Sequence, residues 1–353
     1  MTTAAGSEGG RSAGPIPASI YPVADLAMDE DLLEPTAGMV LHRVLALAAR
    51  TFLLNDAADE PGAEPAPCEV LSADSFRLPD QAQWARTTAE ALNSAQRRTT
   101  EVERVHQSRV ALRRIRSNLR TFRLALDPSW GTSLRAELGW YGGRLGMVRD
   151  LHILQDVITI TGPKVVDPEY IDRLDFIVRG RMAAALAEVA DERGGERRTR
   201  LNKQMLVLWD GPEFKDKAGR PARDVLPPML HRAWRDLRGA ARTARKDRSD
   251  ANLHRLRIRL KDLRYGCETV ALVEGGPARR TAKAAERLQS KLGDLHDACS
   301  SIAWFDDLAA GHPDLREPLV ALIETQQDAA AAARKGWNRE LKGIERRWRS
   351  WQG

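Results

Sequence analysis

The sequence is poor in aromatic residues and in runs of β-branched residues. Phe, Trp and Tyr make up 5% of its 353 residues, whereas Ala, Leu, Arg and Glu are abundant. The abundant residues favour helices, and the scarce ones are those that favour strands. We therefore predict an all-α protein.

Cysteine is also scarce, and long apolar runs are absent. The three cysteines, Cys68, Cys267 and Cys299, are too few and too scattered for a disulfide framework or a thiolate metal site. No stretch approaches 18 consecutive apolar residues, and residues 1–19 lack the apolar core of a secretory signal. We expect a cytoplasmic protein without a membrane-spanning segment.

The sequence does contain a concentration of positive charge. The formal net charge is only +6, because 55 Lys and Arg are balanced by 49 Asp and Glu. The stretch VHQSRVALRRIR at 105–116 nevertheless has no carboxylate, and no acidic residue occurs from Arg104 to Leu126. Like charges one helical turn apart destabilise a helix by about a few tenths of a kcal/mol per pair. An anionic partner would offset this cost, so the stretch is a candidate anion-binding helix.

The basic stretch has a second copy. LHRLRIRLKDLR at 253–264 aligns with it at an offset of 148 residues, which pairs His106 with His254 and Arg113 with Lys261. Downstream, RLGMVRD at 144–150 aligns with KLGDLHD at 291–297. An internal repeat of this length predicts two structurally similar units.

The downstream motif adds a glycine and an aspartate to its basic residues. Gly146 and Gly293 are expected to allow two helices to approach closely. Asp150 and Asp297 are expected to orient a neighbouring arginine or to cap a turn. We do not expect either aspartate to act as a catalytic acid.

The repeat and the composition together predict the organisation of the chain. Residues 1–35 read as a disordered or loosely attached arm, 36–212 as the first repeat and 213–353 as the second. The Pro-rich acidic segment within 57–97 has no counterpart and reads as an insertion. Each repeat holds about four helical patterns, so we predict two tandem four-helix bundles.

The basic residues of each repeat fall on one side of a helix. In the first copy they span about 80° of the circumference at 100° per residue, beside the apolar face. The second copy repeats this arrangement. The residues of the two stripes are His106, Arg109, Arg113, Arg116 and Arg120 in the first copy and His254, Arg257, Lys261 and Arg264 in the second.

The paired HxxRxxxRxxR helices, each followed by LGxxxD, resemble the CHAD family, the conserved histidine α-helical domain. The resemblance implies two four-helix bundles related by a pseudo-twofold axis, with a basic cleft between them that binds inorganic polyphosphate. The implied binding residues are His106, Arg109, Arg113, Arg116, His254, Arg257, Lys261 and Arg264, with Arg144, Arg149, Lys291 and His296 from the downstream motif.

The resemblance implies binding rather than catalysis. Many relatives carry a triphosphate-tunnel domain with an ExExK strand motif, and this sequence lacks that motif. We therefore expect no catalytic residues, metal or cofactor, and we expect the protein to be associated with polyphosphate granules. Histidines among arginines should protonate when phosphate arrives, which predicts tighter binding toward pH 6.

Two other functions are compatible with parts of the sequence. Basic helices also bind the phosphate backbone of nucleic acids, although a stripe beside the apolar face is poorly placed for a duplex. The pair His296 and Asp297 is also found in metal-dependent phosphohydrolases, although such a site needs further His and Asp ligands. Competition between polyphosphate and DNA, and a metal and phosphate-release analysis, would separate these functions.

Overall fold

The computed structural model describes residues 34–56 and 101–352. Every long element in these ranges is an α-helix, and β-structure there is limited to two isolated bridges, Thr36 with Pro221 and Leu126 with Phe214. The prediction of an all-α protein is confirmed. The predicted insertion, and the predicted arm except for residues 34 and 35, lie outside the described residues.

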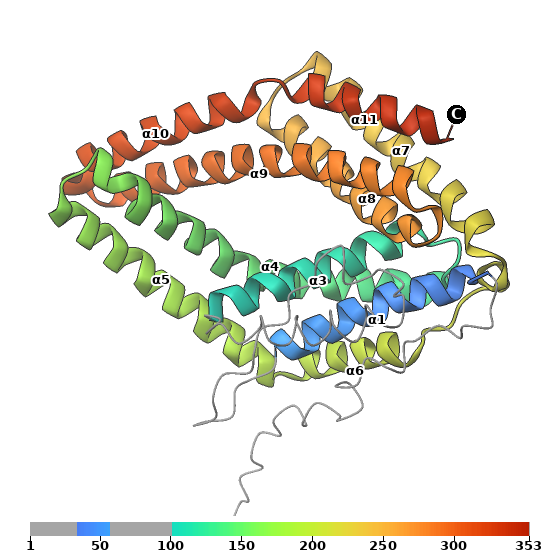
Figure 1. Cartoon of the computed structure of the whole chain (residues 1–353). Helices are drawn as coiled ribbons and strands as arrows, with labels where there is room; N and C mark the ends of the chain where they lie inside the picture. The colour runs from blue at the N-terminus through green and yellow to red at the C-terminus, as the bar shows by residue number, and fades with distance from the viewer. Residues whose placement is uncertain (1–33, 57–100, 353) are drawn as a thin grey trace, which may run out of the picture.

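Each repeat contributes five long helices to the described part of the chain (Figure 1). The first repeat has α1 (Ala37–Asn55), α3 (Glu101–Thr121), α4 (Pro128–Asp156), α5 (Pro168–Gly194) and α6 (Glu196–Asp210). The second has α7 (Ala222–Lys246), α8 (Asp250–Glu274), α9 (Gly276–Gly311), α10 (Arg316–Arg334) and α11 (Trp337–Gln352). The π-helical turn Val157–Thr161 and three short 3-10 turns, Gly162–Lys164, Asp216–Gly219 and Pro313–Leu315, join some of them.

The predicted number of about four helices per repeat was therefore too low. In the second repeat the last helical pattern is divided at Gly336, whose φ of +77° is a conformation that glycine adopts without strain. In the first repeat Gly195 has an extended backbone and is both the last cap of α5 and the first cap of α6. The pseudo-twofold relation of the two repeats stays a prediction.

Helix α1 is a core helix. Thr36 caps its start by accepting a hydrogen bond from the Met39 N–H at 3.3 Å. Within residues 34–56 and 101–352 it is the helix long and apolar enough to cross a membrane, but 83% of its apolar window is buried inside the protein. The helix ends at a buried ion-pair network in which Asp56 accepts from Arg198 and from the Tyr141 hydroxyl.

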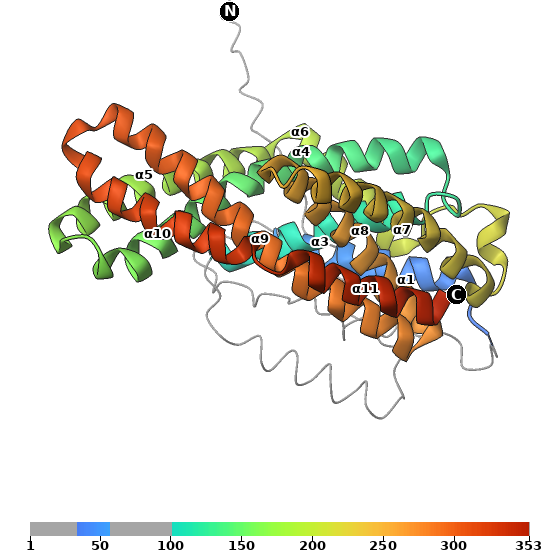
Figure 2. The same ribbon diagram turned by 90° about the horizontal axis from the view of Figure 1, so that it is seen from above.

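The apolar residues form three clusters. One lies mainly in the second repeat and one in the first. The third is shared, because Ile158 and Leu174 of the first repeat pack with Phe305 and Leu319 of the second. This shared cluster lies where α4 and α5 meet α9 and α10, at the end of the molecule that Figure 2 shows opposite α1 and α7.

Helices α3 and α8, which carry the two basic stretches, pack against each other through polar side chains. Arg114 donates a hydrogen bond to Glu268 at 2.5 Å, and Ser117 donates one to Asp262 at 3.1 Å. Thr269 donates to an Asn118 amide oxygen at 2.8 Å. These bonds join the two repeats and fix the relative position of their basic stripes.

Candidate functional site

The two basic stripes converge on one group of side chains from both repeats. Burial lowers the pKa of Arg109 and of Lys261, and positive charges of the other repeat lower each further: Arg257 acts on Arg109, and Arg113 on Lys261. Such effects are strong only over several ångströms. We call this group the central basic cluster: His106, Arg109 and Arg113 of α3, Arg149 of α4, His254, Arg257 and Lys261 of α8, and His296 of α9.

Two histidines of the cluster lie close to each other, and all three lie near its arginines. The rings of His254 and His296 have centroids 4.5 Å apart and are inclined by 49°. Arg149 contacts His152 at 2.6 Å, from an Nη1 atom to a ring nitrogen. His296 of α9 therefore contacts the stripe of α8, and the charge of Arg149 of α4 acts on His106 of α3.

The cluster holds its positive charge in a partly dry environment. Burial, followed by the charges of Arg149 on His106 and of Arg257 on His296, lowers the pKa of both imidazoles to about 4. Burial and Arg257 lower the pKa of Lys261 to about 7, and burial with Arg113 lowers that of Arg109 to about 10. Both histidines are therefore neutral at pH 7, and a bound anion would raise all of these pKa values.

Several side-chain nitrogens of the cluster are buried without a hydrogen-bond partner among the described residues. An unpaired buried donor is costly, and a native structure rarely keeps several together without a reason. Ring and guanidinium nitrogens of this kind are suited to anionic oxygens. They are His106 Nδ1, Arg109 Nε and Nη1, Arg113 Nε, His254 Nδ1 and Arg257 Nε.

One glycine of the downstream motif, Gly146, makes room for an arginine of the cluster. A Cβ atom on Gly146 would lie 2.5 Å from Arg109 Nη1, and one on Gly293 would lie 3.5 Å from Arg257 Nη2. The nearest atoms are thus guanidinium nitrogens, not a neighbouring helix backbone. At Gly146 the missing Cβ atom accommodates the Arg109 side chain, whereas the 3.5 Å at Gly293 is an ordinary contact. The expectation that both glycines allow close helix approach stays a prediction.

Carboxylates adjoin the cluster: Asp150 and Asp297, and also Glu103 near His106 and Asp294 near Arg257. Burial raises the pKa of Asp150 and of Asp297, while Arg109 and Arg257 respectively oppose that rise. Neither forms an ion pair with a residue of the described part. Both carboxylates influence the arginines through space without forming an ion pair with them.

Four of the predicted binding residues are ion-paired with carboxylates of the chain. Arg264 contacts Glu268 at 2.8 Å and Glu286 at 2.5 Å. These four residues therefore each have a carboxylate partner, unlike those of the central basic cluster, but the partner of Arg120, Asp262, is shared with Arg259. The other three pairs are Arg120 with Asp262 at 2.8 Å, Lys291 with Glu340 at 2.8 Å, and Arg144 with Glu188 at 3.6 Å and Glu192 at 3.3 Å.

The structure also reveals a basic residue that the sequence interpretation missed. Arg135 of α4 is half-buried, and the charges of Arg120 and Arg116, after burial, lower its pKa. Its Nε atom has no partner among the described residues. The signal was present in the sequence, because Arg135 precedes Gly139 by one helical turn on the face that also carries Gly146.

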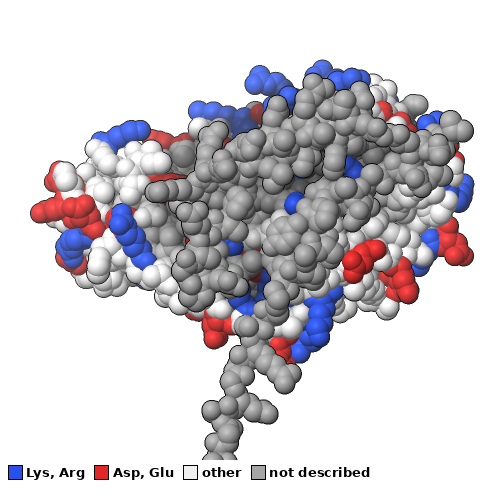
Figure 3. Space-filling view, turned by 60° about the horizontal axis from the view of Figure 1, so that its bottom comes forward, with Lys and Arg blue, Asp and Glu red and all other residues white. Residues whose placement is uncertain are grey.

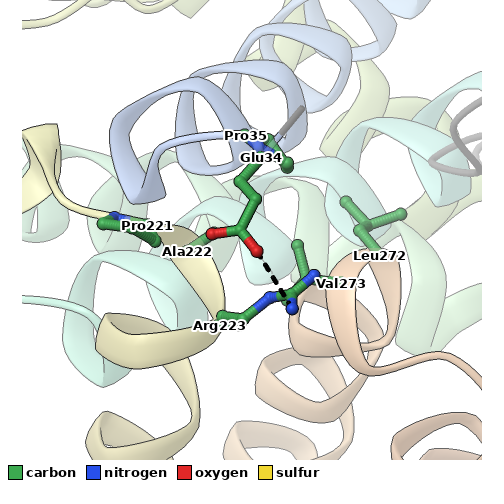
Figure 4. A pocket seen from close by; sticks show the side chains of 7 residues that line it. All are labelled: Glu34, Pro35, Pro221, Ala222, Arg223, Leu272 and Val273. Atoms are coloured by element: carbon green, nitrogen blue, oxygen red, sulfur yellow. Dashed lines mark ion pairs between the residues drawn. The ribbon is translucent and has the colours of Figure 1, made fainter. Parts of the chain in front are cut away.

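Other features of the described surface do not resemble this cluster. No three His, Cys, Asp or Glu side chains come together as a metal site would require in residues 34–56 and 101–352. A small pocket lies away from it, at the start of α1, where Glu34 and Arg223 form an ion pair at 3.0 Å (Figure 4). On the face in Figure 3, basic and acidic side chains are interspersed around the visible rim.

The fold and the cluster define an all-α repeat protein with a cationic site built by both repeats. The family model of the CHAD domain matches residues 81–306, more than half of the chain. The protein therefore belongs to the CHAD family, as the paired basic motifs predicted.

Two solved structures share the fold. PptA from Streptomyces chartreusis is 21% identical, with a TM-score of 0.60 over 87% of this chain and 99% of that chain. The CHAD domain from the plant Ricinus communis is 20% identical, with a TM-score of 0.62 over 90% of this chain and 94% of that chain. A search of curated proteins found no match.

Proposed function

We propose that this protein binds inorganic polyphosphate at the central basic cluster and does not catalyse its turnover. The observation that carries the proposal is the convergence of buried, unpartnered guanidinium and imidazole nitrogens from two repeats on one place. Membership of the CHAD family agrees with it.

The chemistry of the cluster suits a flexible polyphosphate chain. Arginine guanidinium groups can each contact two phosphate oxygens, while Lys261 provides a compact charge. Polyphosphate has no bases, so recognition needs neither stacking surfaces nor base-edge contacts. The half-buried side chains are accessible to a thin chain and poorly accessible to the backbone of a rigid duplex.

Charge reversal within the cluster tests the proposal. A variant with Glu at Arg109, Arg113, Arg257 and Lys261 should lose binding of long-chain polyphosphate in a titration. The matched control carries Glu at Arg232, Arg235, Arg238 and Arg242, which are exposed on α7, and should retain binding. Circular dichroism should show both variants to be helical. A folded cluster variant that binds as tightly as the wild type would refute the proposal.

Competition separates polyphosphate binding from nucleic-acid binding. At fixed salt, long-chain polyphosphate should displace a labelled chain from the wild type, whereas duplex DNA at the same phosphate concentration should not. Displacement by the duplex with equal efficiency would favour the nucleic-acid function instead.

The absence of catalysis is a separate part of the proposal. Incubation of the protein with long-chain polyphosphate and Mg²⁺ or Mn²⁺ should release no orthophosphate above the level of the cluster variant. Metal-dependent release that is lost on replacing His296 or Asp297 would identify a phosphohydrolase.

We also propose that polyphosphate binding places the protein on cytoplasmic polyphosphate granules. A fluorescent fusion should co-localise with granules, and the cluster variant should be dispersed. Co-localisation of both forms would contradict this part.

A further inference from the structure

The two repeats differ beyond the central basic cluster. On α3 the basic stripe continues through Arg116 and Arg120, and Arg123 and Arg135 lie beside it. On α8 the residue aligned with Arg120, at the same offset of 148 residues, is Glu268. The positive charge therefore extends along one repeat only.

The additional arginines of the first repeat resemble those of the central basic cluster in their burial and in their lack of partners. The Nε atoms of Arg116 and Arg135 are buried and have no partner within the described ranges. Gly139 leaves space for Arg116, since a Cβ atom there would lie 3.2 Å from Arg116 Nη2. Burial lowers the pKa of both arginines, and the charge of Arg120 lowers them further.

The carboxylate nearest to this extension is Asp262. It accepts from Ser117 at 3.1 Å and Arg120 at 2.8 Å, and it also contacts Arg259 at 3.4 Å. Asp262 is therefore shared between Arg120 and Arg259, and it forms no ion pair with Arg116 or Arg135. We call Arg116, Arg120, Arg123 and Arg135 the α3 extension.

In the second repeat the arginine at the equivalent position is neutralised by carboxylates. Arg264, the counterpart of Arg116, is held by Glu268 and Glu286. Glu286 aligns with Gly139 at the offset of 147 residues that relates the downstream motifs. Thus the repeat that has a glycine leaves its arginine unpaired, and the repeat that has a glutamate pairs it.

We propose that the α3 extension is an additional phosphate-binding subsite, so that a long polyphosphate chain leaves the central basic cluster along the first repeat only. This rests on the proposed function of the cluster. Arg109 and Arg120 are separated along α3 by about 16 Å at a rise of 1.5 Å per residue. A short chain fills the cluster alone, and only a longer chain reaches Arg135.

The test compares tripolyphosphate with long-chain polyphosphate in titrations of the full chain. Arg135→Ala should lower the affinity for the long chain by about tenfold, the order of one charge-assisted hydrogen bond, and change that for tripolyphosphate by less than about twofold. Arg235→Ala on α7 removes the same charge from an exposed position and should leave both affinities unchanged.

The repeats also suggest exchange variants. Gly139→Glu should pair Arg116 as Glu286 pairs Arg264, and should weaken long-chain binding selectively. Glu286→Gly should strengthen it by releasing Arg264 from one carboxylate. Thermal unfolding of each variant shows whether the fold is retained, and Arg135→Ala alone decides the matter if Gly139→Glu unfolds.

The outcomes distinguish the two proposals. Equal losses for both ligands, or no loss for the long chain with Arg135→Ala, would overturn the α3 extension while leaving the cluster intact. Wild-type binding of both ligands by the four-site cluster variant would overturn the proposed function itself.

Discussion

Lys261 should make polyphosphate binding consume protons near neutral pH. Burial and the charge of Arg257 lower its pKa to about 7 in the free protein, from an ordinary value of 10.5. A bound polyanion brings compensating negative charge and raises that pKa again. The folded, ligand-free protein thus holds Lys261 mostly neutral above pH 7, and the complex holds it protonated.

The expected magnitude follows from proton linkage. If binding restores a pKa of 10.5, the complex should take up roughly 0.9 proton at Lys261 at pH 8. The affinity should then fall by about 50-fold as the pH rises from 7 to 9. His106 and His296, with a pKa of about 4 each, are neutral in the free protein throughout this range.

Calorimetry in buffers of different ionisation enthalpy measures this proton uptake directly. Lys261→Arg keeps the charge at all pH values and should abolish most of the uptake at pH 8 and the steep loss of affinity. The same uptake in wild type and Lys261→Arg would refute the reasoning. The predicted histidine contribution, tightening toward pH 6, should begin only below about pH 6.5, where a bound imidazole starts to protonate.

Three further predictions concern the glycine, salt and the buried ion pair. Gly146→Ala should weaken polyphosphate binding by displacing the Arg109 guanidinium, whereas Gly293→Ala meets its arginine at an ordinary 3.5 Å and should bind nearly as the wild type in the same titration. Affinity should fall about 10²-fold between 50 and 200 mM salt if five cations contact a flexible strand, and a flat salt response would contradict ionic binding. Asp56→Ala should lower the free energy of unfolding by about 3–5 kcal/mol in urea, because buried Arg198 loses its partner. Tyr141→Phe, which removes one hydrogen bond to Asp56, should lower the free energy of unfolding by only about 1 kcal/mol. Equal losses for Tyr141→Phe and Asp56→Ala would argue against a buried, charged Arg198 as the cause.

The fold class was predictable because composition and repetition act over the whole chain. Scarce aromatic residues and abundant helix formers predicted helices, and the two basic stretches predicted which helices correspond. The helix break at Gly336 was not predicted, because a glycine inside a helical pattern does not always end the helix. In the first repeat the separate helix α6, which begins after Gly195, was missed.

The candidate site was predictable in its centre and not at its margins. His106, Arg109 and their partners in the second repeat were identified because the spacing of a helix puts them on one face. Arg264 is neutralised partly by Glu268, one turn further along α8, and partly by Glu286 of α9, whose approach the sequence does not show. Arg135 was missed because its counterpart in the second repeat is Ala282, so the repeat gave no signal for it.

The apolar cluster that contains Ile158 and Phe305 has a consequence for how the protein unfolds. Neither repeat has a complete apolar core at that end of the molecule, because each supplies only part of the cluster. Neither has a complete cationic site either, because α3 and α8 each supply one half of the central basic cluster and of the polar interface between them. The described chain should therefore melt in one cooperative transition rather than repeat by repeat. A ligand held by both halves stabilises the whole by mass action, so that occupancy of a single site protects both repeats against unfolding at once.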